Sequence, residues 1–216
     1  MRPGVFVSFE GSEGCGKSTQ IQAIRSLLEA RGIRCLATRE PGGTALGEVI
    51  RHLLKYAPEG QGMCPQAELL LFAASRAQLV RETIEPALAA GTWVLADRFL
   101  DSSLVYQGIA RGLGVEPVGR INDFALGKCR PDVTFLLDMD ATAAWARAHA
   151  VTEQLGQTDR MESEPSAFYE AVRQGYLTLA AEDPDRVVVV PAARPVEVIR
   201  EEIWQTLTAR FDGLSG

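Results

Sequence analysis

The chain has 216 residues, of which 46% are hydrophobic and 23% are charged, and its formal net charge is −6. These values suit one soluble α/β domain with a sizeable core. The acidic balance argues against a nonspecific binder of nucleic acid or membrane surfaces, so a small anionic ligand would need a local cluster of arginines. No run of about 18 apolar residues is present, so no membrane span is expected.

The cysteines are far apart in the sequence and form no C-x-x-C pair: Cys15, Cys35, Cys64 and Cys129. This spacing argues against a zinc site and favours a reducing compartment. The N-terminus lacks the basic start and long apolar stretch of a signal peptide, because Glu10 directly follows Phe9. We therefore expect a cytoplasmic location.

The first predicted elements are a short buried strand over residues 5–9, a glycine-rich loop and a helix over residues 20–30. Residues 11–18 fit G-x-x-x-x-G-K-[ST], the phosphate-binding loop (P-loop) of NTPases. Glycines let backbone N–H groups surround a phosphate, and the helix N-terminus adds partial positive charge. Lys17 would reach the β- and γ-phosphates of ATP, and the Ser18 hydroxyl would ligate Mg²⁺. The alternative, a chance match in a glycine-rich turn, is disfavoured by the order of strand, loop and helix. The predicted ATP contacts are Gly11, Ser12, Glu13, Gly14, Cys15, Gly16, Lys17, Ser18 and Thr19.

Further strands are predicted over residues 33–38, 93–96, 133–137 and 187–190, and they alternate with helical patterns. Most of them are continuous apolar runs, as expected when helices cover both faces of a parallel sheet. Residues 67–90 read as a long helix, and a last helix follows Pro195. Gly32 and Gly91 stand where glycines end helices. We expect a single domain over residues 1–216 with the P-loop NTPase fold, a five-stranded parallel sheet with helices on both faces.

Two acidic residues end predicted strands, where the ligand crevice of a parallel α/β sheet lies. Asp97 follows residues 93–96 and could act on the metal shell, while the next residue, Arg98, could hold a phosphate. Asp138 follows residues 133–137, and for it we favour the alternative of an N-cap for the next helix.

Arginines follow the P-loop near predicted loop or helix ends that face the crevice, at Arg39, Arg51, Arg76, Arg98, Arg147 and Arg160. Such a set suits a second phosphorylated substrate beside ATP, because arginines offset the repulsion between two anions. The guanine-reading motif N-K-x-D of GTP-binding switches is missing from the sequence.

With these features the sequence resembles the thymidylate kinases, which convert dTMP to dTDP in dTTP biosynthesis. The resemblance covers most of the chain in the family's order, through residues 9–14, 38–44, 70–76, 97–108, 159–160 and the helix that holds Phe168 and Tyr169. It implies ATP and dTMP as substrates, Mg²⁺ as cofactor, and a homodimer packed through helices. The apolar helix at 67–90 could bury such a dimer face or could equally be core.

The resemblance also implies roles on the dTMP side. Phe72 would stack on thymine, although a leucine-rich helix also suits simple core packing. Arg76, one helical turn later, would donate to a base carbonyl oxygen, its alternative being a solvated helix arginine. Ser103 and Gln107, spaced i, i+4, would read the remaining polar edge of the base, and the neighbouring Ser102 is a further predicted dTMP contact.

On the same side, Tyr106 is similar to the family residue that favours deoxyribose, and Glu13 to the carboxylate that meets the sugar 3′-hydroxyl. Both have plainer alternatives, a half-buried aromatic and a solvent-facing loop residue. Arg51 and Arg98 would grip the acceptor phosphate. The segment Glu40–Pro41 would line the pocket for the thymine methyl group. A methyl group gives only about 1–3 kcal/mol of discrimination, so some activity with dUMP is expected.

The polar stretch at residues 151–158 predicts a mobile loop, and the region of about 147–160 resembles the family's lid. Cys15 stands where some relatives carry a P-loop arginine, so the lid arginines Arg147 and Arg160 should supply catalytic charge. The family's lids often carry several closely spaced arginines, and this one does not, so the residue that contacts the transferring group stays open. Lid charge that arrives only on closure would limit wasteful ATP hydrolysis.

The expected mechanism is direct in-line transfer, with Lys17, Arg98, Arg147 and Arg160 as catalytic residues and Ser18 and Asp97 on the metal. It needs no general base, because the acceptor phosphate oxygen is already anionic. Two alternatives are another P-loop kinase and a regulatory ATP-binding protein whose slow turnover would not depend on a monophosphate. Separately, Cys15 near a helix N-terminus could be a reactive thiol with a lowered pKa, or only a small buried hydrophobe.

Overall fold

A computed structural model describes residues 4–147, 160, 164–212 and 214. Its centre is a parallel sheet in the order β2-β3-β1-β4-β5. The strands are β1 (Phe6–Glu10), β2 (Cys35–Arg39), β3 (Trp93–Asp97), β4 (Val133–Asp138) and β5 (Val187–Pro191). All five lie within two residues of the predicted ranges, and the α/β fold class is confirmed.

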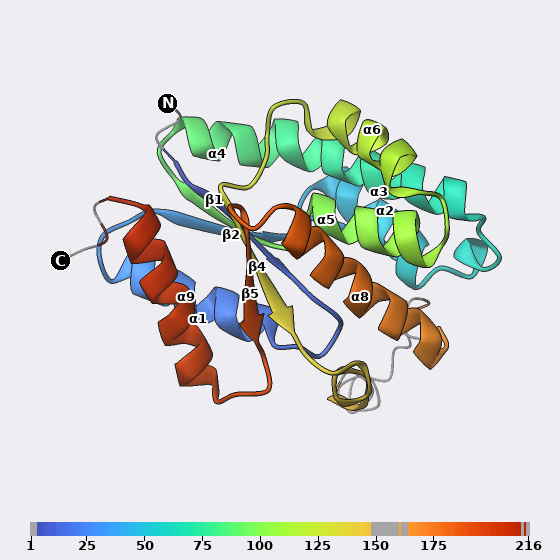
Figure 1. The fold of residues 1–216 in the computed structure, drawn as a ribbon. Helices are drawn as coiled ribbons and strands as arrows, with labels where there is room; N and C mark the ends of the chain where they lie inside the picture. The colour runs from blue at the N-terminus through green and yellow to red at the C-terminus, as the bar shows by residue number, and fades with distance from the viewer. Residues whose placement is uncertain (1–3, 148–159, 161–163, 213, 215–216) are drawn as a thin grey trace.

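Helices cover both faces of the sheet (Figure 1). Helices α1 (Lys17–Glu29) and α9 (Val196–Arg210) lie on one face. The other face carries α3 (Pro65–Leu79), α4 (Glu85–Ala89), α6 (Val115–Leu126) and α8 (Ser166–Glu182). Helix α2 (Ala45–Lys55) packs against α3, and α5 (Leu100–Ser103) continues into the π-helical stretch η3 (Leu104–Ala110).

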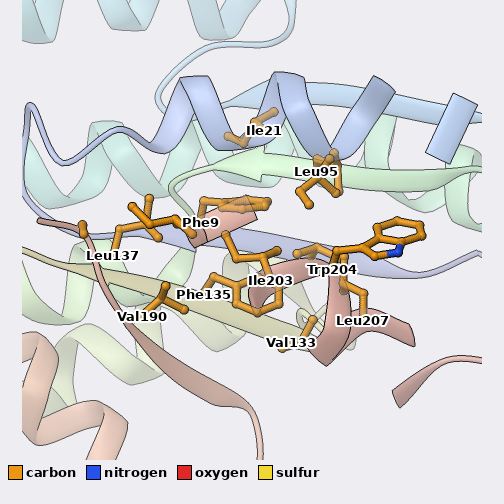
Figure 2. Packing of buried hydrophobic residues seen from close by; sticks show 14 of the residues in the cluster. Phe9, Ile21, Leu95, Val133, Phe135, Leu137, Val190, Ile203, Trp204 and Leu207 are labelled. Carbon is orange, nitrogen blue, oxygen red and sulfur yellow. The ribbon is translucent and has the colours of Figure 1, made fainter. Parts of the chain in front are cut away.

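Successive side chains of β1 point to opposite faces of the sheet and pack into two separate cores. Val7 and Phe9 point to the α1 and α9 side, where they join Phe135, Ile203 and Leu207 in the largest cluster (Figure 2). Phe6 points the other way and packs with residues of α3, α4 and β3. Both faces of β1 are buried, so residues 6–9 are apolar on either side except Ser8, whose hydroxyl forms a hydrogen bond with Thr134 Oγ1 at 2.7 Å.

The predicted helix over residues 67–90 is one helical run with a π-helical turn, η2 (Val80–Ile84), between α3 and α4. A short 3₁₀ turn, η1 (Pro58–Gly60), links α2 to α3. Gly32 and Gly91 have φ angles of 74° each, which confirms them as helix-ending glycines. Among the described residues, no helix has both the length and the apolar character that a membrane span requires.

Asp138 is not the N-cap of the helix that follows β4, so that prediction is wrong. Its carboxylate forms a bidentate ion pair with Arg173 of α8, with Nε–Oδ1 and Nη2–Oδ2 distances of 2.8 and 3.0 Å. The cap is supplied two residues later, where Asp140 Oδ1 accepts from the backbone N–H groups of Thr142 and Ala143. Asp138 thus ties β4 to α8, and the N-cap preference for Asp is met by its neighbour.

Candidate functional site

The loop between β1 and α1 curls around the ammonium group of its own lysine. Lys17 Nζ donates to Ser12 O at 2.8 Å and to Gly11 O at 3.3 Å. Gly11 has a φ of 131°, and a Cβ atom there would lie 2.5 Å from Leu137 O, so only glycine fits. Gly16 opens α1 in the left-handed region with a φ of 95°. The loop therefore has the conformation that the P-loop motif predicts, with its lysine at the N-terminus of α1.

Ser18 and Asp97 meet across the carboxyl ends of β1 and β3. The Ser18 hydroxyl donates to Asp97 Oδ2 at 2.8 Å. Mg²⁺ usually keeps several waters and takes one or two protein oxygens together with substrate phosphates. The described residues contain no cluster of three or more His, Cys, Asp or Glu side chains that could hold a metal. This oxygen pair therefore fits Mg²⁺ that arrives with a nucleotide, better than it fits a metal enclosed by protein ligands.

Two pockets open beside the loop. The first, which we call the η3 pocket, is lined by Glu13, Glu40, Pro41, Lys55, Phe72, Arg98, Ser102, Ser103, Tyr106, Gln107 and Tyr169. The second, the P-loop pocket, is lined by residues 13–20, Asp97, Arg147, Ala192, Arg194, Val196 and Ile199. Glu13 lines both, so the two pockets meet at the P-loop. Nine predicted dTMP-side residues are thereby brought into one pocket, and Phe72 lines it instead of joining the described cores.

Arg98 stands at the junction of the pockets in a strained backbone conformation. Its φ of 69° lies in the left-handed region, which is uncommon for a residue with a side chain and is found at functional sites. Its guanidinium contacts Glu13 Oε1 at 3.1 Å and donates to the hydroxyls of Ser102, Tyr106 and Tyr176 at 3.2–3.3 Å. Burial would raise the pKa of Glu13, but the charges of Arg98 and Lys17 outweigh it and hold that pKa well below its usual range. Glu13 is thus held ionised beside Arg98.

A fully buried carboxylate fixes the chain on either side of Arg98. Glu10 ends β1 and accepts from Phe99 N at 2.7 Å, from Ser102 Oγ at 2.6 Å and from Tyr176 OH at 2.8 Å. Burial, reinforced by the charge of Asp101, raises the pKa of Glu10 to about 7. The hydrogen bond to Phe99 N holds the turn that follows Arg98, so Glu10 secures the strained conformation.

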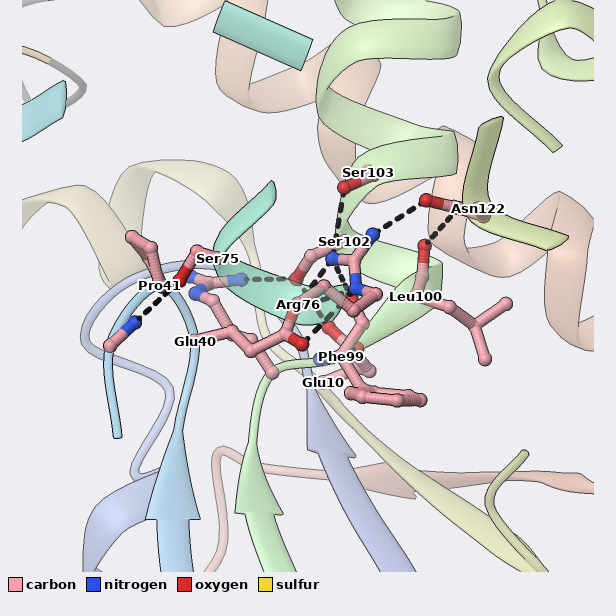
Figure 3. Close-up of polar contacts among 12 residues, drawn as sticks. Glu10, Glu40, Pro41, Ser75, Arg76, Phe99, Leu100, Ser102, Ser103 and Asn122 are labelled. Carbon is pink, nitrogen blue, oxygen red and sulfur yellow. Dashed lines mark hydrogen bonds and ion pairs between the residues drawn. The ribbon is translucent and has the colours of Figure 1, made fainter. Parts of the chain in front are cut away.

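Arg76 lies behind the η3 pocket rather than on its wall. Its side chain is 1% exposed and forms an ion pair with Glu40, with an Nη2–Oε2 distance of 2.6 Å and Nε within 3.1 Å of both carboxylate oxygens. It also donates to Asn122 Oδ1, to Phe99 O and to Ser103 Oγ (Figure 3). Arg76 therefore positions Glu40 and Ser103, which do line the pocket, and its predicted direct contact with a base stays a prediction.

Glu40 precedes Pro41 across a cis peptide bond, and Arg51 Nη1 donates to Pro41 O at 2.9 Å. Arg51 is outside the lining of both pockets and holds the segment that forms the wall of the η3 pocket, and its predicted contact with the acceptor phosphate stays a prediction. Burial raises the pKa of Glu40, although its Arg76 partner acts in the opposite direction.

The two lid arginines lie in different surroundings. Arg147, at the end of a helical stretch over residues 141–147, lines the P-loop pocket. Arg160 instead donates from Nη2 to Glu68 Oε2 at 2.6 Å and from Nε to Leu54 O at 3.0 Å. The rest of the predicted lid, residues 148–159, including the predicted mobile loop, lies outside the described residues. Of the two lid arginines, Arg147 alone lines the P-loop pocket.

Of the two hypotheses for Cys15, the structure favours the small buried hydrophobe. Its side chain is 2% exposed, and burial raises the pKa of the thiol despite the nearby Lys17 and Arg98 charges. The sulfur packs in the core cluster with Phe9 and accepts from Lys17 Nζ at 3.7 Å, and this partner does not outweigh the effect of burial on the pKa. Cys15 is thus the small buried hydrophobe of the alternative reading.

Several site residues were missed in the sequence, although the signals for three of them were present. Glu10 is an acid at a strand end, the same criterion that selected Asp97. Glu68 lies one turn before Phe72 on the same face of α3, and Lys55 one turn after Arg51 on α2. Tyr176 and Arg194 had no local signal, because only the packing of α8 and the chain after β5 brings them to the pockets.

Comparisons with known proteins agree with this geometry. The family model "Thymidylate kinase" matches residues 9–203. The chain is 44% identical to a thymidylate kinase of Methylococcus capsulatus, over 94% of each chain. It is 46% identical to one of Fervidobacterium nodosum, over 95% of this chain and 99% of the relative. The crystal structure of thymidylate kinase from Ehrlichia chaffeensis superposes with a TM-score of 0.76 at 30% identity, covering 95% of this chain and 99% of that one.

The buried Glu10 predicts a pH-dependent stability. Between pH 4.5 and about 7 the folded protein binds a proton that the unfolded chain has released. This contribution is fully present below pH 4.5 and is lost as the pH rises through 7. Glu10→Gln cannot ionise, so the unfolding free energy of the wild type should fall relative to this variant by up to about 3 kcal/mol between pH 5 and 8. Urea unfolding at several pH values measures the difference.

The matched control is Glu201→Gln, which removes an exposed carboxylate on α9. Its stability should follow the wild type at every pH. Parallel curves for Glu10→Gln and the wild type would show that Glu10 is ionised in the folded protein across this range.

Proposed function

The chain belongs to the thymidylate kinase family and transfers the γ-phosphoryl group of ATP to dTMP, giving ADP and dTDP; we propose that the η3 pocket binds dTMP and the P-loop pocket binds ATP. The observation that supports this assignment is that Glu13 and the P-loop lie where the two pockets meet. Nucleotides bound in the two pockets would meet with their phosphates at this junction, which in-line transfer requires.

On the dTMP side, Phe72 would stack on the base, Ser103 and Gln107 would contact its polar edge, and Tyr106 would pack against the sugar. Glu13, held ionised beside Arg98, would accept from the sugar 3′-hydroxyl. Ser102 and Arg98 would reach toward the acceptor phosphate. Arg51 and Arg76 support the pocket through Pro41, Glu40 and Ser103, as their hydrogen bonds indicate.

On the ATP side, the backbone N–H groups of residues 11–19 would surround the phosphates and Lys17 would turn from Ser12 O to the β- and γ-phosphates. Ser18 and Asp97 would hold Mg²⁺, which when bound with ATP neutralises charge on the phosphates. Lys17 and a lid arginine would stabilise charge on the transferring group, while Arg98 positions the acceptor oxygen. No general base is required, because that oxygen is already anionic.

We also propose that residues 1–216 form one domain, that the enzyme acts in dTTP biosynthesis, and that it is cytoplasmic. None of the four cysteines, all in the described part of the chain, forms a disulfide, which suits a reducing compartment. A homodimer packed through helices is supported by exposed apolar side chains on three adjacent helices. These are Leu46 and Val49 on α2, Leu70 on α3 and Phe124, which is 90% exposed, on α6.

The activity is tested by measuring ADP formation from ATP and Mg²⁺ with a panel of nucleoside monophosphates. We expect turnover with dTMP well above dCMP, dGMP and AMP, with dUMP as the best of the others because it lacks only a methyl group. Lys17→Ala should retain less than a few per cent of the activity with an unchanged circular dichroism spectrum. Strong turnover with another monophosphate would overturn the assigned base pocket, and ATP turnover without any acceptor would favour a regulatory ATPase.

The lid arginines should differ in their effects. We propose that Arg147, which lines the P-loop pocket, is the one that contacts the transferring group. Arg147→Gln should lower kcat about 10²-fold with little change in the KM for dTMP, as for the loss of one transition-state donor. Arg160→Gln, which removes one donor from Glu68 behind the η3 pocket, should act mainly on that KM. Steady-state kinetics of both variants decides the assignment, and a kcat loss confined to Arg160→Gln would reverse it.

The dimer proposal predicts that Phe124→Glu shifts the enzyme toward monomer, because a charge would be buried at the interface. Sedimentation equilibrium over a range of concentrations measures the shift. Val198→Glu on α9, at a side chain that is 46% exposed on the opposite face of the sheet, is the control and should sediment like the wild type. A wild-type protein that is monomeric at all concentrations would contradict the proposal.

A further inference from the structure

A buried carboxylate lies directly behind the base-contacting end of the η3 pocket. Glu68, in the first turn of α3, is 1% exposed. Its Oε1 accepts from Gln107 Nε2 at 2.8 Å and from Arg111 Nε at 3.3 Å. Its Oε2 accepts from Arg160 Nη2 at 2.6 Å and from Arg111 Nη2 at 3.4 Å. Both oxygens therefore have partners, and every partner is a donor.

Glu68 is held in its ionised form by these neighbours. Burial would raise its pKa, but the hydrogen bonds from Gln107 and Arg160 and the charge of Arg111 outweigh burial, so the pKa is lowered. An ionised carboxylate has no proton to give and can only accept hydrogen bonds. Whatever faces Glu68 must therefore be a donor.

This requirement sets the orientation of the Gln107 side chain. An amide has an NH₂ end that donates and an oxygen end that accepts, and its two orientations have nearly the same shape. Because Glu68 takes the NH₂ end, Gln107 must turn its Oε1 to the opposite side. Gln107 is 1% exposed and lines the η3 pocket beside Ser103 and Phe72, so the atom that remains for a bound base is an acceptor.

We propose that Glu68 is a specificity-determining positioning residue, which fixes the Gln107 amide with its oxygen toward the base and thereby selects a base with an N3–H donor. Thymine and uracil carry a hydrogen on N3, whereas cytosine presents an N3 lone pair. An acceptor facing an acceptor in a buried site leaves both groups unpaired, which is the situation in which enzymes discriminate most strongly. The inference rests on the proposed role of Gln107 in contacting the base.

The test is Glu68→Gln, with dTMP and 5-methyl-dCMP as acceptors because these bases share the methyl group and differ in the polar edge. Arg160, anchored at Leu54 O, contacts Oε2 at 2.6 Å, whereas Arg111 contacts the two oxygens at only 3.3 and 3.4 Å, so the oxygen of the new amide should stay at the Oε2 position. The new NH₂ group should therefore stand at the Oε1 position and face Gln107, whose amide must turn over and present its NH₂ to the base. We expect the ratio of kcat/KM for dTMP over 5-methyl-dCMP to fall at least about tenfold, with the value for 5-methyl-dCMP itself rising.

The control is Arg111→Gln, which removes another donor from the same carboxylate and leaves the hydrogen bond between Glu68 and Gln107. Its ratio should stay within about twofold of the wild type, since a general weakening of the pocket affects both substrates alike. If Glu68→Gln does not fold, the double variant with Arg111→Gln removes one of the two arginines that face residue 68 and gives the same readout.

The outcomes separate this inference from the function on which it rests. An unchanged ratio in Glu68→Gln, with a wild type that discriminates strongly, would overturn the role of Glu68 and leave the kinase activity and the base pocket intact. A wild type that accepts 5-methyl-dCMP as readily as dTMP would overturn the role of Gln107 as well. A wild type that phosphorylates neither would contradict the proposed function itself.

Discussion

The hydrogen bond between the Glu10 carboxylate and Phe99 N–H is the interaction on which the geometry of the site depends. Glu10 is the last residue of β1 and the P-loop begins at the next residue, while Phe99 directly follows Arg98 at the end of β3. One buried side chain therefore joins the P-loop to the turn that carries Arg98. The left-handed backbone of Arg98 is costly by itself and persists because the surroundings fix it.

The same principle extends around the η3 pocket, where buried charges are fully hydrogen-bonded and each one orients a residue on the pocket wall. Arg76 is held by Glu40 and in turn fixes Ser103, and Glu68 fixes Gln107. Replacing such pairs by apolar residues often leaves stability unchanged or raises it, so stability alone is a weak explanation for their presence. Their positions behind the groups that face the ligand indicate a role in specificity.

Much of this arrangement could be predicted from the sequence because the signals were local. The P-loop motif predicted the loop between β1 and α1, and runs that are mostly apolar predicted the five strands within two residues. The η3 pocket was anticipated from the resemblance, down to Phe72 and Gln107. Arg76 and Arg160 have different surroundings from those expected, since an arginine on a helix gives no sign of which carboxylate it will meet. Arg76 pairs with Glu40, 36 residues away in the chain, and Arg160 pairs with Glu68, 92 residues away.

With dTMP in the η3 pocket and ATP in the P-loop pocket, as we propose, the contrast between the two pockets places specificity in the η3 pocket. In the η3 pocket, Ser103 and Gln107 are each 1% exposed, so a mismatched ligand leaves polar atoms that water cannot reach. In the P-loop pocket, Ser18, Thr19 and Arg147 are exposed, and water can satisfy whatever a nucleotide base leaves unpaired. A phosphate bound by backbone N–H groups carries no information about its base, because every nucleoside triphosphate offers the same oxygens. Discrimination between substrates therefore rests on buried side chains with one permitted orientation, and a carboxylate that can only accept is the simplest means of imposing it.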